Sequence, residues 1–448
     1  MKISKNLYGK LGVAVATLGL LSMSAVTVAG ASSTATLTGD LTFTSSDAAT
    51  SINPAMGGSS FDEPFFNAAI PTFMSEADGV SGSNGPTGMS LYSPVGSSSG
   101  KKGVIAGTYA VGASDVPLGT TVNGTNLDAS LLPGTSAATT LTNYVQIPVV
   151  LGGVGLMYNL PSVTQKFPKN PIILTSAILA GIYDGSITNW NDPAIAKANP
   201  AIVNVKKNKK GKITSSTSAF PNLPIVPVYR ADGSGTSFIF MDYLNQTAGA
   251  NFKNSSGAEV YPSTTFNQSE VPSNALGAQK NAGVAADVEQ TTGAIGYVEY
   301  SYILLQHTLP AAEIVNSSGK AVALNQASVA ADAAAFSSKA PSETSGGVVS
   351  NFSIVNGSTA ASYPIAGYSW AIIRQDWNGL GTVGGTTASL ASEKLVAKFL
   401  DWAVQGGSKG GQHVAQEQGY VPLPSYVSAL AASQIASLTY NGQSLGLN

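Results

Sequence analysis

At 448 residues the chain is long enough for roughly two or three domains with sizeable cores. It contains no cysteine, which excludes disulfides, iron–sulfur clusters, thiolate metal sites and a lipid anchor attached through cysteine. Charged residues make up only 10% of the chain, against about 25% in ordinary soluble proteins, and the net charge is −2. Long-range attraction therefore cannot collect anions, and any anion binding must depend on local donors.

Residues 1–31 have the organisation of a secretory signal peptide. Three lysines precede an apolar run from Leu11 to Met23, and small residues suited to cleavage follow at 29–31. The run is too short to span a membrane, although an uncleaved N-terminal anchor is the alternative interpretation. The pattern predicts a mature protein in the periplasm or outside the cell. The low charge content fits a secreted protein and is also compatible with an acidic habitat.

A glycine turn at residues 57–61 (Gly-Gly-Ser-Ser-Phe) precedes a predicted helix. Apolar residues recur there at Phe65, Phe66, Ala69, Ile70 and Phe73. The first amides of a helix lack intrahelical acceptors and lie at the positive end of its dipole, so this turn is a candidate anion site. A helix cap without a ligand is the alternative.

The next segments alternate between loop and strand signals. Residues 75–103 have the composition of a loop that ends in a Gly/Ser-rich turn at 96–100. The composition of this turn is typical of linkers. Residues 119–142 are predicted to form an exposed loop. Residues 146–158 are almost continuously apolar and β-branched, which predicts a strand buried on both faces. Helical signals at 175–182 follow that strand, and the alternation indicates an α/β domain.

Five lysines between residues 206 and 212 form the one basic cluster of the sequence. No aromatic residues are interleaved with them and Ser/Thr-rich sequence follows. This pattern favours a solvated loop tip over a nucleic-acid site.

The stretch from Arg230 to Ser237 constrains function most. An apolar strand at 223–229 precedes it, a predicted helix at 237–244 follows, and Ser234 or Thr236 can cap that helix. The free amides of the helix start and the guanidinium fork of Arg230 suit a carboxylate or a tetrahedral oxyanion. Asp232 fits such a site if it clamps Arg230 or if the ligand carries a proton to donate. The alternative is a plain loop with a surface ion pair.

The rest of the chain continues the α/β pattern. We expect a helix at 281–288, a turn into a strand at 292–302, a buried strand at 363–373, an amphipathic helix around 395–403 and a terminal helix after Pro424.

Seven segments, in this order, together resemble the phosphate-specific periplasmic binding proteins that serve ABC importers. They are residues 57–61, 96–100, 112–118, 187–194, 230–237, 293–300 and 399–402. The resemblance runs from about residue 36 to the end of the chain.

The resemblance implies an α/β fold of the two-lobed periplasmic binding protein type (type II, Venus-flytrap) with two hinge crossings. It places lobe I at residues 36–147 and 367–448, and lobe II at residues 148–366. The hinges are expected at 146–150 and 364–368, and the ligand between the lobes.

The resemblance also implies a set of ligand contacts and partners. Asp232 is expected to hold Arg230, while Asp62 and Glu63 are expected to point away from the anion. We expect inorganic phosphate and the membrane permease subunits of an ABC importer as partners, a monomer, no nucleic acid, no cofactor, no metal and no catalytic residue. The expected phosphate-binding residues are Ser60, Phe61, Ser97, Asp115, Arg230, Ser234, Gly235 and Thr236.

Asp115 carries the expected selectivity. An ionised carboxylate can only accept hydrogen bonds. Phosphate still has an O–H to donate at neutral pH, whereas sulfate does not. A carboxylate buried against a sulfate oxygen would cost several kcal/mol.

Two other classes of function compete with phosphate binding. A secreted phosphatase would need metal ligands or a general base, but the two histidines, His307 and His413, are far apart and no base is evident near Ser234. A surface or adhesive protein would fit the Ser/Thr/Ala-rich composition. Within the transport hypothesis, arsenate is an alternative ligand.

Overall fold

The computed structural model describes residues 53–76, 88–122, 125–131, 141–248, 271–306, 309–344 and 346–447. The predicted signal peptide and His307 lie outside the described residues. In the part of the chain that is described, no helix has the length and apolar character needed to cross a membrane.

An eight-stranded mixed sheet organises the described residues, in the order β11-β10-β12-β6-β17-β3-β1-β2. Parallel pairs form at its two ends, and the three central pairings (β12 with β6, β6 with β17, β17 with β3) are antiparallel. Its strands are β1 (Met56–Gly58), β2 (Ser93–Pro94), β3 (Val111–Ser114), β6 (Tyr144–Tyr158), β10 (Val226–Arg230), β11 (Leu276–Ala278), β12 (Ala294–Glu299) and β17 (Ala366–Arg374).

The long strand β6 joins the two ends of this sheet. Its residues 144–153 pair with β17, and its residues 154–158 pair with β12. The register with β17 shifts between Ser369 and Trp370, so that Val149 has no partner and β6 carries a bulge there. This bulge lies inside the first predicted hinge. The lobe boundaries at 147/148 and 366/367 stay a prediction.

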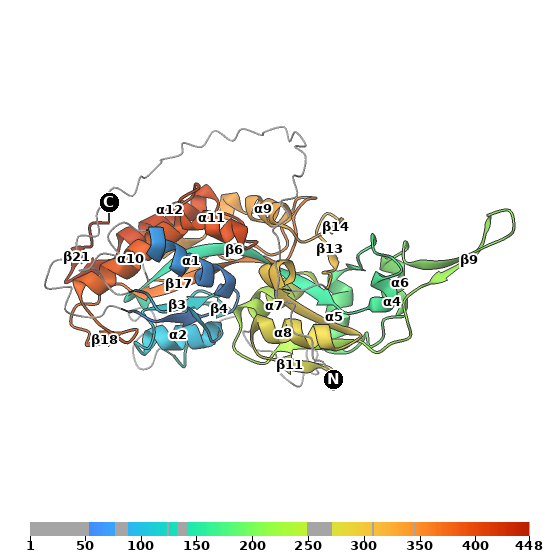
Figure 1. The fold of residues 1–448 in the computed structure, drawn as a ribbon, viewed down its shortest axis with the longest axis horizontal. Helices are drawn as coiled ribbons and strands as arrows, with labels where there is room; N and C mark the ends of the chain where they lie inside the picture. Colours follow the sequence, from blue (N-terminus) through green and yellow to red (C-terminus); the bar gives the residue numbers. More distant parts are fainter. Residues whose placement is uncertain are drawn as a thin grey trace, which may run out of the picture. The chain divides into compact units, whose positions relative to one another are not determined.

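Helices cover the β1–β3 end of the sheet on both faces. In Figure 1, α2 (Ser97–Ile105) lies below these strands, and α1 (Glu63–Glu76), α10 (Leu390–Val404), α11 (Gly411–Glu417) and α12 (Ser425–Ala436) lie above them. At the other end α8 (Lys280–Gln290) packs on β12 and β10, and α7 (Gly235–Thr247) packs on β12 and on α5 (Ser176–Asp184).

Shorter elements complete the fold. The remaining helices are α4 (Pro161–Thr164), α6 (Pro193–Ala198), α9 (Gln326–Ala335), the π-helix η4 (Tyr302–Gln306) and the 3₁₀ helix η5 (Ser337–Lys339). The remaining strands are β4 (Thr121–Val122), β5 (Thr125–Asn126), β7 (Ile173–Leu174), β8 (Val203–Lys207), β9 (Ile213–Ser218), β13 (Glu313–Val315), β14 (Ala321–Val322), β15 (Ser342–Glu343), β16 (Val349–Ser350), β18 (Thr382–Val383), β19 (Thr386–Thr387), β20 (Thr439–Tyr440) and β21 (Gln443–Ser444).

Most predicted elements are confirmed. Every residue of β6 is buried, as its continuous apolar sequence requires. The basic cluster lies on and between β8 and β9, where its lysines are exposed, as predicted for a solvated tip. One prediction is wrong: residues 97–103 are not a loop but the start of α2, because the small Ser/Gly residues pack closely against β1 and β3.

Candidate functional site

The turn between β1 and α1 brings three polar side chains into the protein interior. Ser59, Ser60 and Asp62 are all at most 1% exposed. Ser59 Oγ accepts a hydrogen bond from the Phe61 amide at 3.0 Å and donates to Asp115 Oδ2 at 2.9 Å. The Phe61 amide therefore donates within its own turn in this structure.

The start of α2 supplies Ser97, which is fully buried. Gly96 precedes it with φ +91°, a conformation that favours glycine, and provides no side-chain cap to the helix. Ser97 Oγ accepts hydrogen bonds from the amides of Gly235 at 3.0 Å and Asp115 at 3.4 Å. The Ser/Gly-rich turn at 96–100 is thus part of the site and not a linker.

Arg230 ends β10 and is 1% exposed. Its Nε and Nη2 donate to the two carboxylate oxygens of Asp232 at 2.6 and 2.5 Å, so Asp232 clamps the guanidinium as expected. Burial alone would raise the pKa of Asp232, but the hydrogen bonds and charge of Arg230 and the amide of Lys280 lower it overall. The buried Nη1 of Arg230 has no hydrogen-bond partner among the described residues.

Helix α7 begins directly after this pair. Ser234 is the N-cap, since its Oγ accepts from the Ser237 amide at 3.1 Å, and this settles the choice between Ser234 and Thr236. Thr236 Oγ1 lies 3.5 Å from Asp115 Oδ2. The start of α7 therefore contacts Ser97 at the start of α2 and Asp115 after β3.

Asp115 follows β3 and lies at the centre of these contacts. Oδ1 accepts from Ser369 Oγ at 2.6 Å, and Oδ2 accepts from Ser59 and Thr236. Burial raises the pKa of Asp115 to about 6, although the Ser369 and Ser59 hydrogen bonds and the charge of Arg230 oppose the rise. The carboxylate remains the main acceptor of the site at neutral pH.

The structure brings the eight predicted residues together at one buried place. Direct hydrogen bonds join the Ser97 and Asp115 side to the Gly235 and Thr236 side. The buried members are Ser60, Phe61, Ser97, Asp115, Arg230, Ser234, Gly235 and Thr236.

Several residues of the site were not predicted. Asn281, at the start of α8, donates its amide and its Nδ2 to Ser60 Oγ at 3.0 and 3.1 Å, and its Nδ2 also reaches Thr236 Oγ1 at 3.3 Å. Tyr297 of β12 accepts the Arg230 amide at 2.9 Å. Ser369 of β17 reaches Asp115. Asn281 and Ser369 belong to a helix and a strand of unremarkable local sequence. Tyr297 lies in the segment 293–300 of the family resemblance but was not singled out there.

The expectation that Asp62 points away from the anion stays a prediction. Its side chain is fully buried, and Asp62 Oδ2 lies 2.8 Å from the same Ser369 Oγ that contacts Asp115. Asp62 directly follows the buried turn and precedes the first residue of α1. Glu63 takes another direction and accepts a hydrogen bond from Tyr302 at 2.6 Å.

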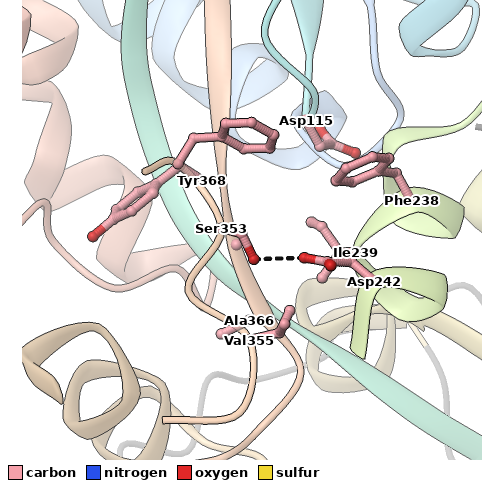
Figure 2. Close-up of a pocket in the computed structure, with 10 residues that line it drawn as sticks. Asp115, Phe238, Ile239, Asp242, Ser353, Val355, Ala366 and Tyr368 are labelled. Atoms are coloured by element: carbon pink, nitrogen blue, oxygen red, sulfur yellow. Dashed lines mark hydrogen bonds between the residues drawn. The ribbon is translucent and has the colours of Figure 1, made fainter. Parts of the chain in front are cut away.

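A small cavity adjoins Asp115 between α7 and β17. Figure 2 shows Phe238, Ile239 and Asp242 of α7 on one side of it and Ser353 and Ala366 on the other, with Ser353 hydrogen-bonded to Asp242 and the Tyr368 ring pointing away from α7. Its volume is about 10 Å³, enough for at most one water molecule. The two sides of the site are thus in close contact.

The described residues contain no group of three or more His, Asp and Glu side chains that could hold a metal ion. His413 is half exposed and lies 3.4 Å from Glu417, one helical turn away on α11. His413, the histidine that the structure describes, is therefore paired at the surface with Glu417 and not with a residue of the buried site.

Comparisons with known proteins agree on one family. Residues 26–406 match the family described as "PBP superfamily domain". The chain is 30% identical over 343 residues to the phosphate-binding protein PstS of Haemophilus influenzae, which covers 77% of this chain and 83% of that protein. It is also 30% identical over 342 residues to PstS of Xylella fastidiosa, covering 76% of each.

A solved structure has the same fold. It is that of a high-affinity periplasmic phosphate-binding protein (PfluDING) bound with phosphate, with a TM-score of 0.59 over 85% of this chain and 93% of that chain, at 19% identity. The predicted mixed α/β, two-lobed fold is thereby confirmed. Both relatives are named as phosphate-binding proteins. The chain belongs to the PBP superfamily and, within it, to the family of the PstS phosphate-binding proteins.

Proposed function

We propose that this protein binds inorganic phosphate between its two lobes and delivers it to the permease subunits of an ABC importer. The ligand contacts are Ser60, Phe61, Ser97, Asp115, Arg230, Ser234, Gly235 and Thr236. The protein acts as a monomer in the periplasm or outside the cell, after removal of residues 1–31, and needs no cofactor.

The observation that carries the proposal is the incomplete pairing of Arg230. A buried guanidinium donor without an acceptor is costly, and Asp232 accepts only from Nε and Nη2. Nη1 is buried and has no partner among the described residues. A tetrahedral oxyanion would accept from this donor and complete the charge-assisted contacts of the guanidinium.

The serine hydroxyls support the same ligand. Ser60, Ser97 and Ser234 each accept hydrogen bonds from backbone amides. A hydroxyl has one proton and two acceptor positions. Ser60 and Ser97 each accept two hydrogen bonds, and Ser234 accepts one. The proton of each hydroxyl is therefore left to donate to an anion.

Asp115 supports a ligand that carries a proton. Its carboxylate accepts from three hydroxyls and would repel an anion that has no hydrogen to donate. Phosphate and arsenate satisfy this requirement at neutral pH, whereas sulfate does not. The relatives named as phosphate-binding proteins favour phosphate between the two.

Calorimetric titration of the purified protein with phosphate, sulfate and arsenate tests the proposal. We expect saturable phosphate binding with one site per chain and no heat of binding for sulfate. Turnover of a chromogenic phosphoester by metal-free protein would instead support a phosphatase. The absence of saturable oxyanion binding would favour the surface or adhesive class.

A further inference from the structure

Two buried carboxyl groups share one hydroxyl beneath the candidate ligand site. Ser369 Oγ lies 2.8 Å from Asp62 Oδ2 and 2.6 Å from Asp115 Oδ1. Asp62 and Ser369 are fully buried and Asp115 is 2% exposed. The three side chains come from the start of α1, from β17 and from the turn after β3.

The hydrogen count of this cluster requires an additional proton. A serine hydroxyl has one hydrogen and can donate it to one acceptor at a time. If both carboxyl groups were ionised, one of the two short O···O contacts would hold no hydrogen and would be repulsive. Two neighbouring buried charges of the same sign would add to that cost. One of the two carboxyl groups is therefore protonated.

The partners of the two groups decide which one holds the proton. Asp115 accepts from three hydroxyls and lies within the field of Arg230, which stabilise its ionised form. Asp62 has only the Ser369 contact, and its Oδ1 has no partner among the described residues. An ionised Asp62 would thus be far less well solvated than an ionised Asp115.

The other ionisable groups around Asp62 act in the same direction. Those that face it are Asp115, Glu299 of β12, Tyr92 before β2 and Tyr420 after α11, and none of these four is a cation. Burial, followed by the charge of Asp115, raises the pKa of Asp62 well above its ordinary value. Burial also raises the pKa of Glu299 to about 8.

We propose that Asp62 is a positioning residue that holds a proton at neutral pH. Asp62 donates this proton to Ser369 Oγ, and Ser369 donates its own to Asp115 Oδ1. The chain of donors runs in one direction and ends on Asp115, so it keeps the Asp115 carboxylate ionised and able to accept. A neutral Asp62 also avoids a second negative charge beneath a site for an anion.

The first test uses the protein without ligand. Carbon-13 NMR of protein with labelled aspartate carboxyl groups identifies Asp62 as the resonance lost in Asp62→Asn. We expect this resonance at the chemical shift of a protonated acid at pH 7. Glu299→Gln, which removes a neighbouring buried carboxyl that has no contact with Ser369, is the control and retains the resonance. A resonance of an ionised carboxylate at pH 7 would overturn the proposal.

The second test rests on the proposed function and measures phosphate affinity at pH 7. The side-chain amide in Asp62→Asn can still donate to Ser369, whereas the methyl group in Asp62→Ala cannot. The Asp62→Asn protein should therefore bind phosphate about fivefold more tightly than the Asp62→Ala protein. Ser369→Ala removes the shortest hydrogen bond to Asp115 and should lower affinity about tenfold. If Asp62 is ionised instead, Asp62→Asn removes a charge that repels the ligand.

An affinity of Asp62→Asn ten times that of the wild type or higher would therefore contradict the proposal. So would equal affinities for Asp62→Asn and Asp62→Ala. If the wild-type protein binds no phosphate, the proposed function fails, and the NMR test still decides the protonation of Asp62.

Discussion

Gly235 lies so close to Asp115 that a Cβ at position 235 would be 2.5 Å from Asp115 Cβ and 2.6 Å from its Oδ2. The two residues come from α7 and from the turn after β3, which belong to different predicted lobes. Only glycine allows the start of the helix to approach the carboxylate this closely. The contact is therefore a sensitive point for closure around a ligand.

Gly235→Ala is expected to lower phosphate affinity about 10- to 100-fold, because overpacking of this kind costs about 1–3 kcal/mol. Gly406→Ala, at a position where a Cβ would meet nothing within 4 Å, is the control and should bind as the wild type does. Calorimetry measures both. Equal affinities for the two variants would show that the lobes need not approach this closely.

Asp115→Asn is expected to admit sulfate. The amide can donate to an oxyanion that has no proton, so sulfate should compete with phosphate within about tenfold, a difference of about 1.4 kcal/mol. Competition calorimetry measures the ratio, with the half-buried Asp287→Asn on α8 as the control. If Asp115→Asn still discriminated against sulfate as the wild type does, Asp115 would not be the residue that determines selectivity.

The same carboxyl group should make selectivity depend on pH. Burial raises the pKa of Asp115 to about 6, so the group gains a proton as the pH falls through that value and can then donate to sulfate. Sulfate binding should therefore strengthen from pH 7 to pH 5 in the wild type and stay constant in Asp115→Asn. A pH-independent ratio of sulfate to phosphate affinity in the wild type would contradict this.

The raised pKa also affects folding stability in the absence of ligand. The native state holds the Asp115 proton more tightly than the unfolded chain does, since its pKa is raised from 3.8 to about 6. The contribution of this group to the free energy of unfolding is therefore present below pH 3.8 and is lost as the pH rises to about 6. Urea unfolding of the wild type and Asp115→Asn across this window measures the difference.

Arg230→Lys is expected to lower phosphate affinity about 100-fold, or roughly 3 kcal/mol. A lysine ammonium cannot pair with both oxygens of Asp232 and still direct a donor to the ligand. Arg374→Lys, at an arginine whose guanidinium lies 5.2 Å from the Tyr144 ring centre, is the matched control. Wild-type affinity in Arg230→Lys would mean that the guanidinium fork does not contact the ligand.

A buried ion pair outside the site should matter for stability. Lys101 and Asp128 are 1% and 4% exposed in their side chains, and Lys101 Nζ lies 2.8 Å from Asp128 Oδ1. Asp128→Ala leaves the ammonium buried without a partner, which should lower the free energy of unfolding by about 3–5 kcal/mol.

The double variant Lys101→Met/Asp128→Leu should lose less, because no unpaired charge remains. Glu417→Ala, which removes half of the exposed His413 pair, should change the free energy by at most about 0.5 kcal/mol. Urea unfolding compares the three. If Asp128→Ala were no more costly than Glu417→Ala, the buried pair would not contribute to stability.

Much of the fold could be predicted from local patterns. The apolar run of β6, the helical spacing of α10 and the glycine turn before α7 each depend on residues close together in the chain. The start of α2 was missed because Ser/Gly-rich sequence has low intrinsic helix preference, and packing against β1 and β3 outweighs that preference.

The sequence by itself determined two candidate anion sites, at residues 57–61 and 230–237, because glycine turns and helix caps are local features. Composition favoured a linker at residues 96–100, which only the family resemblance added to the site. Tertiary structure alone decided what supports the donors of these turns. Asp62 and Ser369 are separated by 307 positions, and no pattern connects a lone serine in a strand to a carboxyl group that distant. Their meeting fixes where a proton resides, since the shared hydroxyl has a single hydrogen for two buried acceptors.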